Sequence, residues 1–426
     1  MMKTKAVRIH GARDLRLDEF DLPPLQDDEI LARVVSDSIC MSSHKLAMQG
    51  ERHKRVRGTL AEKPAVIGHE FCGVIEQVGA AWAGAFQAGA KFTIQPALNY
   101  PDQQGQATLW APGYSYQYIG GDATYIIIPP EVMEMNCLLL YTGDNFYLGS
   151  LAEPVSCIAG AFHAQYHTEA GSYRHVMGIA EGGSLLFLAG AGPMGLCAVD
   201  YALHNPRKPS RLVVADIDES RLSRAASLLT AEDARENGVE LVYVNTKALS
   251  DPVGALRDRN RGALYDDVFV FAPVKPVLEL GGRLLGRGGC LNFFAGPTDP
   301  EFSGSLNFYN VHYEGHHIVG TSGGSTDDMK EALSLMAGGV INPVFMVTHI
   351  GGLDAAAQAT LDLDAIPGGK KLIYTHKRLG LSAIAGFAEK GRDDPFFRRL
   401  GDICASYNGL WNKEAEDYLL EHAPEI

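Results

Sequence analysis

The chain has 426 residues, of which 46% are hydrophobic and 21% charged, and its formal net charge is −14. This composition is typical of a globular protein with room for two domains, and the acidic balance argues against a nucleic-acid partner. The sequence contains neither an apolar run long enough for a membrane-spanning helix nor the apolar core of a signal peptide, and its seven cysteines follow no regular spacing, so we expect a cytoplasmic protein without disulfides and without a membrane.

The first part of the chain, up to about residue 130, contains short β-type runs that glycine and proline interrupt. These runs predict a mostly antiparallel β domain. From about residue 160, continuous apolar runs alternate with segments of helical spacing, which predicts a parallel sheet covered by helices on both faces. The fold class is therefore expected to be α/β.

The tail from about residue 378 has a different character. Asp394 and Pro395 have the residue types of an N-cap and a first helical position, and they predict a helix that starts there. One apolar stripe is predicted on it, comprising Phe397, Leu400, Cys404, Tyr407 and Trp411. Such a stripe favours packing or contact between subunits over a catalytic role, and we expect a homodimer or homotetramer.

A glycine-rich turn lies between an apolar strand and a helix of the second part. It is predicted to bind the phosphates of a dinucleotide, and it comprises Gly190, Gly192, Pro193, Met194 and Gly195. In such a turn the first glycine allows a tight bend, the second lets a pyrophosphate approach, and the third lets helix and strand pack closely. The alternative is a turn that only connects a strand to a helix.

An acidic residue follows this turn at the expected distance. Asp216 ends the next strand, 21 residues after Gly195, where about 20 are expected for the residue that binds the adenosine ribose. Its carboxylate would repel a 2′-phosphate, so NAD(H) is favoured, although the nearby Arg221 keeps NADP(H) possible.

Four residues with metal-binding side chains precede the glycine-rich turn, and they are Cys40, His69, Glu70 and Glu153. A catalytic zinc has three protein ligands and one open position, which Cys40, His69 and one of the two glutamates would satisfy. Taken singly, a buried cysteine or histidine is more often a packing residue than a ligand. The sequence therefore predicts one Zn²⁺ and leaves the third ligand open.

The motifs around Cys40, His69–Glu70, Glu153, the glycine-rich turn and Asp216 jointly resemble the zinc-dependent medium-chain dehydrogenases, in particular the polyol dehydrogenases. The resemblance implies a GroES-like catalytic domain over residues 1–160 and a Rossmann domain over 161–323. Residues 324–426 would return to the first domain and add a helical C-terminal extension. It also implies zinc ligation by Cys40, His69 and Glu70, with Glu153 as a further glutamate.

The sequence departs from this family in two places. The segment 95–120 has no cysteine where many members carry a structural zinc, so we expect no structural zinc. Where a relay histidine is common, this chain has Lys45, preceded by His44, while Ser42 keeps the hydroxyl position. The predicted catalytic residues are Ser42, Glu70 and Lys45, with Ser42 passing a proton while hydride moves to or from the nicotinamide.

The segment between Cys40 and His69 is rich in basic residues, against the overall charge of −14. It is a candidate phosphate site with Lys45, Arg52, Lys54, Arg55 and Arg57, and a solvated loop is the alternative. Further stretches of the chain resemble sugar-phosphate reductases, and they are residues 91–100, 111–129, 266–274, 290–300 and 307–313. The predicted function is oxidoreduction of a sugar phosphate, and the alternatives are a polyol dehydrogenase, a metal-free enone or quinone reductase, and a non-catalytic nucleotide-binding protein.

Overall fold

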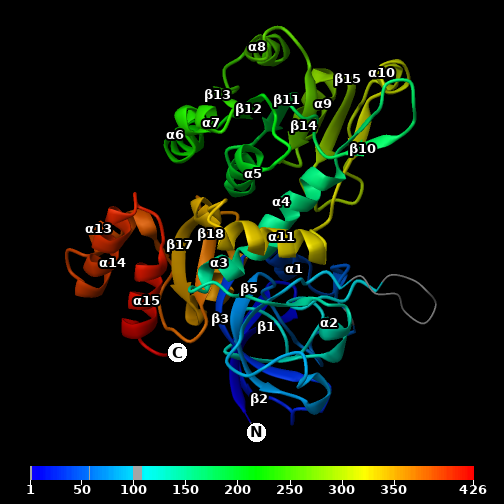
Figure 1. Ribbon diagram of the computed structural model, residues 1–426. Helices are drawn as coiled ribbons and strands as arrows, with labels where there is room; N and C mark the ends of the chain where they lie inside the picture. Colours follow the sequence, from blue (N-terminus) through cyan, green and yellow to red (C-terminus); the bar gives the residue numbers. More distant parts are fainter. Residues whose placement is uncertain (1, 57, 99–107) are drawn as a thin grey trace. The chain divides into compact units, whose positions relative to one another are not determined.

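The computed structural model describes residues 2–56, 58–98 and 108–426 (Figure 1). The chain divides into two compact units. The first comprises Met1–Glu153, Ser325–Ala337 and Val347–Ile426, and the second comprises Pro154–Gly324 and Gly338–Met346. Both contain sheets and helices, which confirms the α/β class.

The first unit contains an eight-stranded sheet in the order β19-β17-β18-β3-β5-β6-β8, with β7 paired to β3, and a three-stranded sheet in the order β2-β1-β4. All pairs are antiparallel except β17 with β18. The strands are β1 (Lys3–Gly11), β2 (Asp14–Asp21), β3 (Ile30–Ile39), β4 (Ala65–Val66), β5 (Phe71–Val78), β6 (Lys91–Ile94), β7 (Tyr125–Ile128), β8 (Leu138–Leu140), β17 (Val347–Gly352), β18 (Lys370–Tyr374) and β19 (Ser382–Ala383).

The helices of the first unit lie between these strands and in the tail. They are α1 (Met41–Gln49), η1 (Gly50–Arg52), η2 (Ala80–Trp82), α2 (Pro130–Glu134), α3 (Tyr147–Ser150), α11 (Thr326–Ala337), α12 (Leu353–Leu361), η4 (Ile384–Gly386), α13 (Phe387–Lys390), α14 (Pro395–Ser406) and α15 (Lys413–His422). Helix α4 (Ala152–Ala164) begins in this unit, whose first segment ends at Glu153.

Described residues of the first unit pack into hydrophobic clusters on opposite faces of β1. Along β1, Ala6 belongs to one cluster, whereas Val7 and Ile9 belong to the other. Successive strand residues point to opposite faces, so a strand of this kind serves both clusters.

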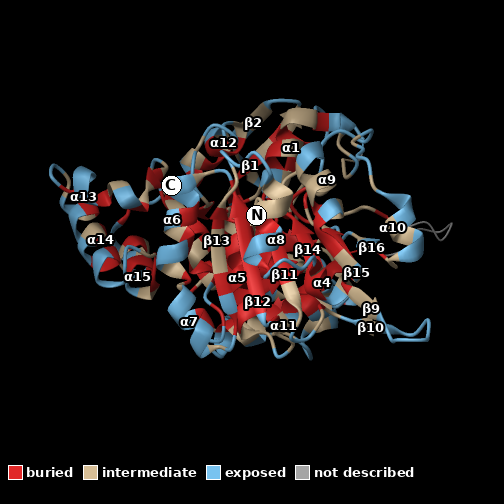
Figure 2. Cartoon of the chain, turned by 90° about the horizontal axis from the view of Figure 1, so that it is seen from above, coloured by how far each residue is buried: buried red, intermediate tan, exposed pale blue. Residues whose placement is uncertain are grey.

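The second unit contains a six-stranded parallel sheet in the order β13-β12-β11-β14-β15-β16 and a hairpin of β9 and β10. In this order the first strand, β11, lies in the middle and the strand order reverses beside it, as in a Rossmann fold. Its strands are β9 (Tyr166–Thr168), β10 (His175–Met177), β11 (Ser184–Leu188), β12 (Arg211–Asp216), β13 (Glu240–Asn245), β14 (Tyr265–Val270), β15 (Leu285–Phe293) and β16 (His317–Val319). Figure 2 shows the central strands in the buried colour, as expected for a sheet covered on both faces.

The helices of the second unit connect these strands. They are α5 (Pro193–His204), α6 (Glu219–Leu228), α7 (Ala231–Glu236), α8 (Pro252–Arg259), α9 (Lys275–Leu284), α10 (Phe308–Tyr313) and η3 (Pro343–Met346). Among the residues that the structure describes, no helix is both long and apolar enough to cross a membrane.

The tail forms the predicted helix, but the predicted apolar stripe is wrong at its end. Asp394 caps α14 by accepting a hydrogen bond from the backbone N–H of Phe396 at 2.9 Å. The helix ends at Ser406, because Asn408 and Gly409 have left-handed φ values of 56° and 75°. Tyr407 is half exposed, and Trp411 is buried in the segment before α15.

Candidate active site

Pairing of two strands brings three predicted metal ligands together. Cys40 follows β3, whereas His69 and Glu70 precede β5, and the two strands pair antiparallel in this region. Before them, Gly68 has a φ of +88°, and a Cβ there would lie 2.6 Å from the backbone nitrogen of Asp122. One ligand atom each from Cys40, His69 and Glu70 falls within 4.8 Å of the others.

Burial favours the neutral forms of the Cys40 thiol and the His69 imidazole in the absence of a bound cation. His69 is 3% exposed and Glu70 is 1% exposed. Burial raises the pKa of the Cys40 thiol to about 12 and lowers the pKa of His69 to about 4. A bound cation would favour the thiolate and keep the imidazole neutral. A thiolate, an imidazole and a carboxylate at this spacing fit Zn²⁺.

Glu70 already has a buried cationic partner. Lys370 Nζ contacts both carboxylate oxygens of Glu70, with 2.5 Å to Oε2, and both side chains are at most 7% exposed. Burial alone would lower the pKa of Lys370, but the charges of Cys40 and Glu70 outweigh it and the net shift is upward. This pair was missed by sequence reasoning, because the two residues are 300 positions apart.

Glu153, in the first turn of α4, lies close enough to the same cluster for its charge to act on it. Its carboxylate is not among the ligand atoms of Cys40, His69 and Glu70 that lie within 4.8 Å of one another. Burial is the main reason why the pKa values of Cys40 and Tyr114 are raised, and the charge of Glu153 raises both further. The first unit therefore offers two carboxylates near Cys40 and His69. Glu70 is tied to Lys370, and Glu153 lies farther out.

The imidazole of His69 is held at both nitrogens. A hydrogen bond of 3.2 Å joins Nδ1 to Ser43 Oγ, and another of 3.2 Å joins Nε2 to the Tyr114 hydroxyl. Nε2 also lies 4.0 Å from Glu70 Oε1, so this nitrogen faces the cluster. A partner on the other ring nitrogen is the usual way in which a ligand histidine is oriented. Tyr114 had no motif around it that could have indicated its place.

The hydroxyl of Ser42, part of the predicted relay, hydrogen-bonds the Tyr114 oxygen, which itself bonds His69 Nε2. His44 points elsewhere, because its Nδ1 bonds the carbonyl of Thr360 at 2.9 Å. Lys45 is half buried, which lowers its pKa, while the charge of Cys40 raises it. Lys45 thus lies close enough to Cys40 for their charges to interact.

The other predicted phosphate residues lie in and after η1. Lys54 is exposed, Arg55 is partly buried, and Arg52 is exposed at the end of η1. Arg57 lies outside the described residues, as does the middle of the segment expected to lack a structural zinc.

In the second unit, the glycine-rich turn connects β11 to α5. Gly192 is the N-cap of α5 and Pro193 is its first residue. A Cβ on Gly195 would lie 1.9 Å from the carbonyl oxygen of Gly190, so only glycine allows this approach. A Cβ on Gly192 would have no atom within 4 Å, which leaves open space where a phosphate could approach the helix N-terminus.

The carboxylate of Asp216 is tied to this turn. It accepts hydrogen bonds from the backbone N–H groups of Ala191 at 3.0 Å, Ile217 at 2.7 Å and Asp218 at 3.1 Å. Arg221 is half exposed and its Nε lies 3.7 Å from Asp218, so its charge faces Asp218. Met194 follows Pro193 in the first turn of α5.

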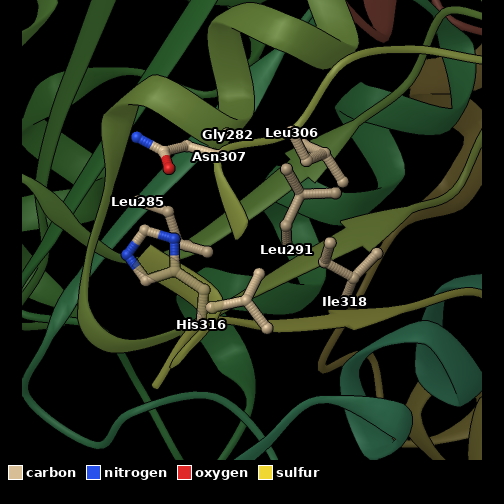
Figure 3. Close-up of a pocket in the computed structure, with 8 residues that line it drawn as sticks. Gly282, Leu285, Leu291, Leu306, Asn307, His316 and Ile318 are labelled. Carbon is tan, nitrogen blue, oxygen red and sulfur yellow. The ribbon is translucent and has the colours of Figure 1, made fainter. Parts of the chain in front are cut away.

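A small pocket lies elsewhere in this unit, between α9, β15, β16 and the segment before α10 (Figure 3). Apolar side chains line it together with Asn307 and His316, and it contains none of the predicted nucleotide-binding residues. It carries no charged group that would recognise a pyrophosphate.

Comparison with known proteins agrees with this geometry. The alcohol dehydrogenase GroES-like domain matches residues 26–136, and the zinc-binding dehydrogenase domain matches residues 193–338. Mannitol-1-phosphate 5-dehydrogenase of Aliivibrio fischeri is 52% identical over 99% of this chain and 98% of its own length. L-sorbose 1-phosphate reductase of Klebsiella pneumoniae is 49% identical over 100% of this chain and 99% of its own. The chain belongs to the zinc-binding dehydrogenases.

A solved structure supports the fold of this zinc-binding dehydrogenase. A Sinorhizobium meliloti zinc-binding dehydrogenase bound to NADP superposes with a TM-score of 0.68 at 20% identity, covering 88% of this chain and 100% of the other. The predicted family, its polyol dehydrogenase branch and the GroES-like and Rossmann folds are therefore confirmed. The chain is a zinc-dependent alcohol or polyol dehydrogenase.

Proposed function

We propose that this dehydrogenase reduces L-sorbose 1-phosphate to D-glucitol 6-phosphate, or the reverse, with a nicotinamide cofactor. The observation that carries the proposal is the Cys40, His69 and Glu70 cluster in the same unit as a basic loop. Two relatives that match nearly the whole chain are named for phosphorylated hexose or hexitol substrates, which supports a phosphorylated substrate here.

The chemistry divides between the cluster and the cofactor turn. A zinc ion bound by Cys40, His69 and one glutamate would act as a Lewis acid on the substrate oxygen. Lys370 contacts the Glu70 carboxylate directly and would hold it in place beside the ion. The Ser42 hydroxyl, bonded to Tyr114, would carry the proton between the substrate oxygen and solvent.

The cofactor site is proposed in the second unit. The turn from Gly190 to Gly195 would hold the pyrophosphate, and Asp216 would bind the ribose hydroxyls, with NAD(H) favoured and NADP(H) possible. We propose one catalytic zinc and no structural zinc. A cytoplasmic homo-oligomer is part of the same proposal.

A polyol dehydrogenase acting on unphosphorylated substrates is the second candidate, because the zinc cluster serves both. A panel of ketoses, polyols and their phosphates, assayed with NADH and NADPH and with zinc content measured, separates them. We expect turnover of L-sorbose 1-phosphate to exceed that of L-sorbose in kcat/KM, in a protein with one zinc per chain. A preference for free sugars, or for mannitol 1-phosphate, would overturn the specific assignment.

A further inference from the structure

The loop after η1 is attached to the metal cluster through an aromatic stack. The ring of His53 stacks on Tyr114 with centroids 5.7 Å apart and planes 12° apart. Tyr114 in turn packs on His69 with centroids 4.8 Å apart and bonds its Nε2. Two aromatic contacts thus connect the loop to a ligand residue of the predicted zinc site.

Three cations gather around His53. The Arg55 guanidinium lies 5.5 Å from the centroid of the Tyr114 ring and donates to the carbonyl of Leu109 at 3.0 Å. The pKa of His53 is lowered to about 4, first by burial and then by the charges of Arg55, Lys54 and Lys45. Among the described residues, the charges that act on it are all positive.

We propose that Lys45, Lys54 and Arg55 form the subsite for the phosphate group of the substrate, beside His53 and Tyr114. The inference rests on the proposed function and deepens it by naming the residues. A phosphate monoester carries close to two negative charges, which suit a guanidinium fork and two ammonium groups. Lys45 lies near both Lys54 and the metal cluster, since its charge interacts with both Lys54 and Cys40.

The structure separates these three cations from Lys63, another basic residue of the same segment. Lys63 is exposed in the same segment and is not among the charges that act on His53. It therefore provides a matched control for removing one positive charge from the segment.

The test compares Lys54→Met and Arg55→Gln with Lys63→Met. The probes are L-sorbose 1-phosphate, L-sorbose and inorganic phosphate as a competitive inhibitor. We expect each subsite variant to lower the ratio of kcat/KM for phosphorylated over free sugar by at least tenfold and to raise the inhibition constant of inorganic phosphate, while Lys63→Met changes neither. The wild-type preference should shrink as salt increases.

The outcomes distinguish the two proposals. If the wild type prefers the sugar phosphate but neither variant changes the ratio, the subsite is wrong and the function stands. If the wild type prefers free sugars, the function is wrong. The subsite then stands only if inorganic phosphate still inhibits and does so less in both variants.

A separate observation concerns Glu416 in the tail. This side chain is fully buried in α15, and its carboxylate accepts hydrogen bonds from the backbone N–H of Phe146 at 2.7 Å and of Tyr147 at 2.9 Å. These groups belong to the N-terminus of α3, whose own N-cap residue, Phe146, supplies no side-chain cap. A carboxylate 270 positions away thus caps this helix.

A buried network holds that carboxylate in place. The Tyr374 hydroxyl donates to Glu416 Oε1 at 2.9 Å, and Trp411 Nε1 donates to the Tyr374 oxygen at 2.7 Å. Only Leu151 separates α3 from α4, whose second residue is Glu153.

The geometry points to Glu416 as a positioning residue that sets where Glu153 lies relative to Cys40 and His69. Ser150 in α3 donates to the carbonyl of Ser36 on β3 at 3.0 Å, so the capped helix is also fixed to the strand that leads to Cys40. Loosening the cap would let Glu153 move while Cys40 and His69 stay on their strands.

The test measures the zinc dissociation constant by chelator competition for Glu416→Gln, Glu153→Gln and the double variant. Glu421→Gln, at an exposed site on the same helix, is the control. We expect Glu416→Gln to weaken zinc binding at least fivefold in the wild-type background and to have no further effect once Glu153 is replaced. Equal losses in both backgrounds, or no loss at all, would overturn the positioning role. If Glu416→Gln does not fold, Tyr374→Phe removes one bond to the same carboxylate, and the same comparison applies.

Discussion

Replacing Lys370 by methionine removes the cation that pairs with Glu70, while keeping a long apolar side chain in its place. The carboxylate would then be left 1% exposed with no cation beside it, except for a bound zinc ion. Removing one partner of a buried ion pair costs about 3–5 kcal/mol of folding free energy. For a unit of this size, that corresponds to a melting temperature lower by about 6–20 °C in zinc-free protein.

Zinc should reverse part of this loss, because the ion supplies the positive charge that Lys370 no longer provides. Thermal unfolding of wild type and Lys370→Met, each with chelator and with saturating zinc, measures the difference. The double variant Glu70→Gln with Lys370→Met should recover most of the lost stability, since neither charge remains buried. Lys3→Met is the control, because the Lys3–Glu19 pair is exposed and worth about 0–1 kcal/mol. A Lys370→Met protein as stable as wild type without zinc, or destabilised equally with and without zinc, would refute this reasoning.

Three further predictions concern other sites. Cys40→Ser should abolish stoichiometric zinc binding and most activity while leaving NADH binding unchanged, as followed by metal analysis and fluorescence titration. Asp216→Ala should raise the NADPH/NADH ratio of kcat/KM, because it removes the charge that repels a 2′-phosphate. Burial raises the pKa of Glu416 from 4.5 to about 7, so between these values the folded protein holds a proton that the unfolded chain has lost, and stability falls as pH rises. Glu416→Gln should remove this pH dependence of the free energy of unfolding, which amounts to about 3 kcal/mol over the range and is measured by denaturant titrations.

Local patterns in the sequence predicted much of the fold. Alternating apolar strands and helices predicted the parallel sheet, because both periods are set by neighbouring residues. Asn408 and Gly409 are residue types typical of a left-handed turn, and they adopt one here. The predicted apolar stripe nevertheless continued past them to Trp411. The strand order of the sheet depends on contacts between distant segments and could not be predicted from periodicity alone.

The candidate site likewise contains residues that local motifs predicted and residues that only contacts between distant segments bring in. Cys40, His69 and Glu70 were predicted together because each stands in a short recognisable motif. Lys370 and Tyr114 were missed, because a lysine in a strand and a tyrosine in a loop have no local feature that indicates a buried contact. Lys370 and Tyr114 belong to the site through contacts with Glu70 and His69, which lie 300 and 45 positions away in the sequence.

The carboxylates of Glu70 and Glu153, both near Cys40 and His69, are restrained by different contacts. Substitutions at those contacts can therefore show which of the two is the third zinc ligand. Glu70 is restrained by a cation, so a zinc ion that used it would compete with Lys370 for the same oxygens. Glu153 is restrained through α3 and its distant cap, so its distance from Cys40 depends on the tail. If Glu70 completes the site, Lys370→Met should tighten zinc binding and Glu416→Gln should not change it. If Glu153 completes it, Glu416→Gln should weaken zinc binding while Lys370→Met acts mainly on stability.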